Sequence, residues 1–141
     1  MNALWLTRTK CEVARGWRNS RHSLLPACLA IVTPLGQIDA RNAQHFWEAV
    51  ASVSRDHSII VADLTAQVDC DWHAMSALIM ALRYTDTGGG ELRVAAGSAP
   101  VRTALATAGV DRLLAVFGGL AEALPDDDPP LESGLSGFAS A

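Results

Sequence analysis

Apolar positions in this chain fall into short runs that predict strands, separated by longer stretches with helical spacing. Residues 58–64 read SIIVADL, a nearly continuous apolar run that is typical of a strand covered on both faces. Residues 28–35 predict an earlier strand that ends near Pro34, because proline has no N–H to donate to a sheet. Residues 91–95 and 113–117 predict two further short strands.

Between these runs the apolar spacing changes to that of helices. Asp39 has the chemistry of a helix N-cap, and the residues after it predict an apolar face at helical spacing: Ala43, Phe46, Trp47, Val50 and Val53. Near residues 73–85 a second helix is expected, with a buried stripe at Met75, Leu78, Ile79 and Leu82. Three glycines, residues 88–90, should stop it.

The last third of the chain repeats this alternation. Ser98 is expected to cap a third helix with Pro100 in its first turn, and Gly109 to end it. Residues 120–124 should begin a final helix. Strands alternating with helices imply right-handed crossovers and parallel pairing. The predicted fold class is therefore α/β, a single small domain with a mixed, mostly parallel sheet of four to five strands and helices packed against it.

Composition sets the domain limits. The chain has 141 residues, of which 50% are hydrophobic and 18% charged, which suits one folded domain. We expect this domain over residues 23–124. Residues 1–22 form a basic extension, part of it a candidate edge strand and part disordered. Residues 125–141 are rich in Pro, Gly, Ser and Asp, and predict a disordered acidic tail.

Charge and cysteine content limit the classes of partner and the cellular compartment that we expect. The net charge is −4 and the body of the chain is acidic, so no nucleic-acid partner is expected. The longest apolar stretch, residues 24–35, contains two prolines and is too short to insert into a membrane. The cysteines, Cys11, Cys28 and Cys70, are far apart with no CxxC pair, which favours reduced thiols in a cytoplasmic protein.

Three segments, in this order and at this spacing, resemble a known family. They are LGQIDARNA (residues 35–43), VADLTAQVDCD (residues 61–71) and SAPVRTALATAGVDRLLAVF (residues 98–117). Residues 29–124 are similar to the STAS domain of bacterial anti-sigma factor antagonists. The resemblance implies a domain without catalysis, cofactor or small-molecule substrate. Its loop before the second helix, with that helix, would dock on an anti-sigma factor with a histidine-kinase-like ATPase fold, and release a sigma factor.

The family's phosphorylation site is altered in this chain. In the family a serine directly after the loop aspartate accepts phosphate and breaks the complex, whereas this chain reads Asp71-Trp72-His73-Ala74. We therefore expect no serine phosphoswitch, and Ser76, one turn into the helix, is a poor acceptor. The residues expected to bind the partner are Asp71, Trp72, His73, Ala74 and Met75, with Asp39 and Ser76 at the margin. Asp71 should also cap the helix.

The sequence leaves two alternatives for the position of the Trp72 side chain. An exposed indole would be a binding anchor, because tryptophan is enriched among interface hot spots. Alternatively, the ring folds back over the core.

Other functions are conceivable for the same fold or the same loop. STAS-like domains also serve as small subunits of lipid-transport ATPases and in sensory assemblies. The stretch VDCDWHAM (residues 68–75) would suit a metal site, or a nucleophilic pair of Cys70 and His73. However, neighbouring side chains on a strand edge diverge and no second ligand cluster is present, so no metal is expected. Cys70 fits better as a small buried hydrophobe. Asp63 is expected to bond loop amides at the end of its strand.

Overall fold

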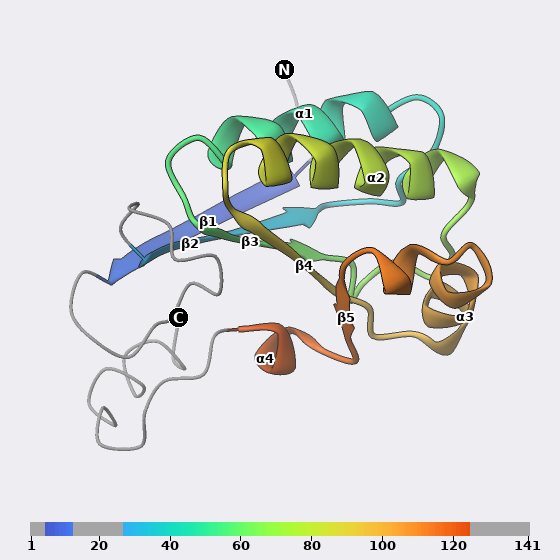
Figure 1. Cartoon of the computed structure of the whole chain (residues 1–141). Coiled ribbons are helices and arrows are strands. Elements are labelled where there is room, and N and C mark those ends of the chain that lie inside the picture. Colours follow the sequence, from blue (N-terminus) through green and yellow to red (C-terminus); the bar gives the residue numbers. More distant parts are fainter. Residues whose placement is uncertain (1–4, 13–26, 125–141) are drawn as a thin grey trace.

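The sheet has five strands in the order β1-β2-β3-β4-β5. The computed structural model describes residues 5–12 and 27–124. The strands are β1 (Trp5–Glu12), β2 (Ala27–Pro34), β3 (Ile59–Asp63), β4 (Glu91–Ala95) and β5 (Ala115–Phe117). The helices are α1 (Ala43–Val53), α2 (Trp72–Thr87), α3 (Ala99–Thr107) and α4 (Leu120–Ala123), with a 3-10 turn η1 at Val110–Arg112. The predicted α/β class is confirmed (Figure 1).

Strands β2 to β5 pair in parallel, and β1 pairs with β2 in antiparallel register, with Trp5 opposite Pro34. The sheet is therefore mixed and mostly parallel, as predicted. An edge strand within residues 1–22 is confirmed by β1. The disorder predicted for the rest of that extension and for residues 125–141 lies outside the described residues.

Helices α1 and α2 lie side by side over one face of the sheet, and α4 lies on the opposite face (Figure 1). Alternate residues of each strand serve the two faces, because strand side chains have a period of two. Ile60 and Ala62 of β3 join the core under α1 and α2. Ile59 and Val61 belong to the second cluster, which includes Ala123 of α4. Every residue of β3 is buried, as the apolar run predicted.

The buried stripe of α2 is rotated from the predicted one. Five side chains of α2 are buried, and three of them are alanines: Ala74, Ala77, Leu78, Ala81 and Thr85. Met75, Ile79 and Leu82 are only partly buried, although they pack against the same core. Alanines on the inner face let the helix approach the sheet closely, which leaves the longer side chains at its flanks.

The start of α1 also differs from the prediction. The helix begins at Ala43 with Asn42 in the N-cap position, so Asp39 is not its N-cap. The Asp39 carboxylate instead accepts the backbone N–H of Arg41 at 2.9 Å. Its backbone carbonyl accepts the N–H groups of Asn42 and Ala43 at 3.2 and 2.9 Å. Asp39 thus stabilises a turn that precedes the helix.

Other boundaries follow local chemistry. Ser98 caps α3 by accepting the N–H of Val101, and Gly89 and Gly109, which follow α2 and α3, have positive φ angles of 81° and 79°. The last strand starts two residues later than predicted, because the N–H groups of Leu113 and Leu114 bond the carbonyl of Val110 in the turn that follows α3. The prediction of reduced cysteines is wrong for Cys28, which is disulfide-bonded. Among the described residues, no helix combines the length and apolar character needed to cross a membrane.

Candidate functional site

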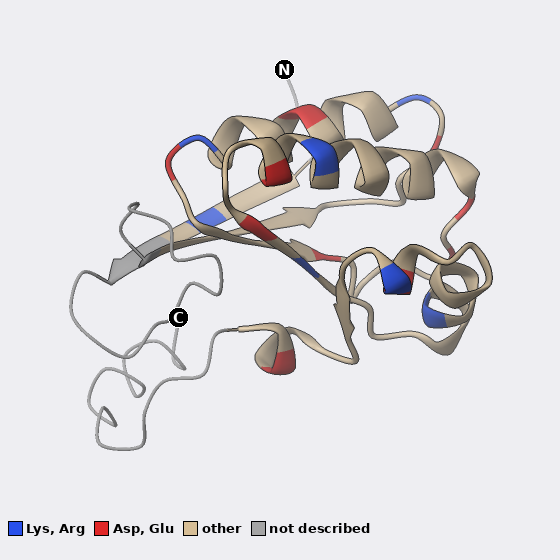
Figure 2. Cartoon of the chain, viewed as in Figure 1, with Lys and Arg blue, Asp and Glu red and all other residues tan. Residues whose placement is uncertain are grey.

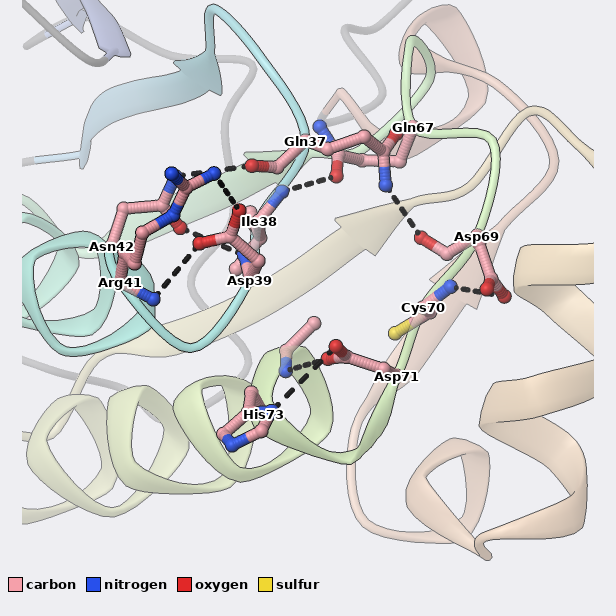
Figure 3. A network of polar contacts seen from close by, with 11 residues as sticks. Gln37, Ile38, Asp39, Arg41, Asn42, Gln67, Asp69, Cys70, Asp71 and His73 are labelled. Carbon is pink, nitrogen blue, oxygen red and sulfur yellow. Dashed lines mark hydrogen bonds and ion pairs between the residues drawn. The ribbon is translucent and has the colours of Figure 1, made fainter.

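The candidate site lies at the end of the sheet where β2, β3 and β4 finish and their chains turn toward α1, α2 and α3. In parallel sheets this carboxyl edge is where binding sites usually form. The β2–α1 loop (residues 35–42) and the β3–α2 loop (residues 64–71) lie against one another here (Figure 3). Acidic positions mark the segment that leads into α2 (Figure 2).

Two glutamines join these loops. The side chain of Gln67 accepts the backbone N–H of Ile38 at 2.9 Å and donates to the carbonyl of Gly36 at 2.8 Å. The side chain of Gln37 accepts the N–H of Val68 at 2.8 Å and donates to the carbonyl of Asp69 at 3.3 Å. No sequence motif predicts these contacts. Gln67 is a polar residue in a buried position, but that burial is evident only in the structure.

Asp71 begins α2 as predicted. Its backbone is extended, and its Oδ1 accepts the N–H of Ala74 at 3.0 Å. This is a helix N-cap, and the carboxylate also faces the positive end of the helix dipole. The other oxygen of Asp71 lies 3.6 Å from Nδ1 of His73, a contact that becomes an ion pair when the imidazole is protonated.

Trp72 is exposed, with 68% of its surface accessible, so the interpretation in which it folds over the core is wrong. Its only described ring contact is with the adjacent His73, at 4.5 Å between ring centroids and an interplanar angle of 32°. Val68 and Leu35, on the two joined loops, are also exposed.

The remaining residues of the predicted binding set are placed differently. Ala74 is buried against the core, Met75 is half-buried, and Ser76 is exposed on the first turns of α2. Asp39 lies on the other loop, where Arg41 holds the pKa of its carboxyl below the usual value by hydrogen bonding. The site therefore combines Asp71, Trp72 and His73 with neighbouring loop residues, while Ala74 supports it from beneath.

Cys70 is the free cysteine of the described residues and is buried, as expected for a small hydrophobe. Burial, together with the charges of Asp71 and Asp69, raises the pKa of its thiol to about 11. The thiolate, which is the nucleophilic form, is therefore scarce at neutral pH. This argues against the catalytic pair with His73. Across residues 5–12 and 27–124, no three His, Cys, Asp or Glu side chains are grouped to hold a metal ion.

Asp63 serves the loop structure, as predicted. Its buried carboxylate accepts the backbone N–H of Thr65 at 3.1 Å and the hydroxyl of Thr33 at 3.0 Å. Arg8, from the antiparallel edge strand, adds an ion pair at 3.9 Å that the sequence did not predict.

A five-stranded mixed sheet with two helices over one face, and two hydrogen-bonded loops at its carboxyl edge, defines a small α/β domain. Residues 24–123 match the model of the STAS domain family. Because this match covers most of the chain, the protein belongs to the STAS domain family. No curated protein matches the chain in sequence.

Solved structures show the same fold. A Mycobacterium paratuberculosis anti-sigma factor antagonist is 20% identical, covering 84% of this chain and 91% of its own, with a TM-score of 0.60. A candidate anti-sigma factor antagonist of Thermotoga maritima is 18% identical, covering 67% and 83%, with a TM-score of 0.61. The anti-sigma factor antagonist SpoIIAA, in its unphosphorylated form, is 10% identical, covering 77% and 87%, with a TM-score of 0.54.

Proposed function

We propose that this chain is an anti-sigma factor antagonist that acts by binding rather than by catalysis. Its partner would be an anti-sigma factor with a histidine-kinase-like ATPase fold, whose capture frees a sigma factor. The observation that carries the proposal is the exposed Trp72 beside the Asp71 cap, at the first residue of α2. Family membership and the similar structures of two named antagonists support the class of partner.

Binding through this surface would not depend on phosphorylation of the antagonist. The position at which the family accepts phosphate is an indole, and the next is an imidazole. Tryptophan is enriched among the hot spots of protein interfaces, where it fills a pocket of the partner. Regulation would then come from the abundance of the partner or from its nucleotide state.

The test is affinity purification from cells of the source organism with this chain as bait, with and without ADP, and identification of the co-eluting proteins. We expect wild type to retain a histidine-kinase-like anti-sigma factor and Trp72→Ala to lose it. Tyr84→Ala is the control, because Tyr84 is an aromatic residue with 49% exposure toward the other end of the same helix. Retention is compared per folded molecule, since Tyr84 also stacks on Trp47. Recovery of a lipid-transport permease and ATPase, or equal retention by Trp72→Ala, would contradict the proposal.

A further inference from the structure

The amide of Gln67 substitutes for a strand partner. Its side chain is buried, and its two polar atoms bond the carbonyl of Gly36 and the N–H of Ile38, two residues apart in the β2–α1 loop. A neighbouring strand would satisfy the same pair of backbone groups. The orientation of the amide is dictated by chemistry, because the carbonyl requires a donor and the N–H requires an acceptor.

Gln37 makes the reverse arrangement. Its amide accepts from the N–H of Val68 and donates to the carbonyl of Asp69 in the β3–α2 loop. Each loop thus lends one side-chain amide to the backbone of the other. Ser98 extends the connection to a third loop, since its hydroxyl donates to the backbone carbonyl of Gln67 at 3.3 Å.

We infer that Gln37 and Gln67, here called the glutamine clasp, are positioning residues that hold the two loops as one cooperative unit and so fix the docking surface. The inference rests on the proposed function. Gln67 is adjacent to the exposed Val68 and lies five residues before Trp72, so the loop that the clasp holds leads directly into the start of α2. A surface that is already ordered loses less conformational freedom on binding.

The four hydrogen bonds are mutually dependent by geometry. Loss of the Gln67 amide leaves the Gly36 carbonyl and the Ile38 N–H without their partners, and the loop then has to separate from its neighbour to reach water. Separation of the loops also breaks the bonds of Gln37. Each glutamine should therefore protect the backbone that the other one bonds. Two independent side-chain contacts would not have this property.

The experiment measures amide hydrogen exchange by NMR in the full chain, comparing wild type with Gln67→Met, Gln37→Met and the double variant. We expect Gln67→Met to speed exchange about tenfold at the Val68 amide, which Gln37 bonds, and Gln37→Met to do the same at the Ile38 amide. Rates are expressed as protection factors, because Val68 and Ile38 directly follow the substituted residues and their intrinsic rates change with that neighbour. The protection factors are compared with those of amides in β3, which report global unfolding. Acceleration confined to the amides that each glutamine itself bonds would overturn the inference.

Gln44→Met is the matched control. Gln44 is exposed on α1 and its side chain donates to Glu48 at 3.0 Å, so its loss should leave the Ile38 and Val68 amides unchanged. Should the buried Gln67→Met variant fail to fold, Gln37→Met still decides the matter, because Gln37 is exposed. A lowered protection factor at the Ile38 amide in this variant, after correction for the changed neighbouring side chain, distinguishes a clasp from two separate contacts.

The same variants then serve as bait in the pull-down of the proposed function. We expect Gln67→Met and Gln37→Met to weaken retention of the anti-sigma factor about tenfold per folded molecule. If Trp72→Ala loses the anti-sigma factor while both clasp variants retain it as wild type does, the positioning role alone is overturned. Equal retention by all of these variants would overturn the proposed function instead, so the two failures are distinguishable.

Discussion

The two ends of α2 each carry an exposed aromatic residue, but the rings have different surroundings. Near the C-terminal end, Tyr84 stacks on Trp47 of α1, at 5.1 Å between ring centroids and an interplanar angle of 19°. At the N-terminal end, Trp72 has only its sequence neighbour His73 as a described ring partner. The first pair joins two helices. The second pair lies within the first turn of a single helix.

This difference separates stability from binding within a single helix. A ring that stacks across α1 and α2 contributes to the folded state, because it buries apolar area in both helices. A ring with 68% exposure buries little apolar area on folding, so most of that area is still accessible to a binding partner. The N-terminal end of α2 is therefore the one that we assign to a partner.

The largest expected effect is at the packed end. Trp47→Ala should lower the free energy of unfolding by about 3 kcal/mol, since a partly buried indole and its stacking contact are both lost. Urea denaturation followed by circular dichroism measures this. Trp47→Phe, which keeps an aromatic ring against Tyr84, should lose clearly less. If the two variants were equally destabilised, the stacking would contribute nothing.

The second prediction concerns the buried side of the N-terminal end. With the pKa of Cys70 raised to about 11, the folded thiol should alkylate about a hundredfold more slowly at pH 8 than in urea. Iodoacetamide labelling with mass spectrometry measures the rate, and Cys70→Ser identifies the signal. Labelling of Cys70 as fast in folded as in unfolded protein would show that this end is open.

The same shift has a consequence for stability. Between about pH 9 and pH 11 the unfolded thiol ionises while the folded one keeps its proton. The folded state then binds more protons, so this group's contribution to stability is complete below pH 9 and is lost as the pH rises to 11. Denaturation curves of wild type and Cys70→Ser should therefore converge across that range.

Much of the fold could be predicted from the sequence because its signals are local. The run at residues 58–64 had the length and composition of a buried strand, and Ser98, Asp71 and the glycines after Thr87 marked helix ends. The stripe of α2 was misplaced because apolarity alone does not tell a core alanine from a flanking methionine. Packing distance decides that, and it depends on the sheet beneath.

The candidate site was predictable only in part. A cap and an indole are visible in four consecutive residues, so Asp71 and Trp72 could be identified. The exposure of the ring could not be read from them. The glutamine clasp joins residues about thirty positions apart by side chain to backbone bonds, which leave no periodic pattern. Such contacts emerge only once the two loops are placed together.

The third prediction contrasts directly with Trp47. Trp72→Ala should change the free energy of unfolding by no more than about 0.5 kcal/mol, since the ring is mostly exposed. It should nevertheless weaken binding of the retained anti-sigma factor by about thirtyfold, the usual loss at a hot spot. Denaturation and titration calorimetry on the same preparation measure both. A destabilisation as large as that of Trp47→Ala would remove the contrast between the two ends.

The last prediction concerns the helix cap, where the change in stability is small and binding need not change. Asp71→Ala should destabilise the fold by about 1 kcal/mol, because the N–H of Ala74 loses its acceptor at the first turn of α2. Asp71→Asn keeps an acceptor oxygen and removes the charge, so it should retain most of the stability and lose only the favourable contact with the helix dipole. Thermal denaturation at low salt distinguishes the two variants.

If Asn were as destabilising as Ala, charge rather than capping would hold this end of the helix, and added salt should then reduce the difference between wild type and both variants. If Asp71→Asn also binds the anti-sigma factor as wild type does, the charge of Asp71 stabilises the helix only, and Trp72 makes the contact with the partner.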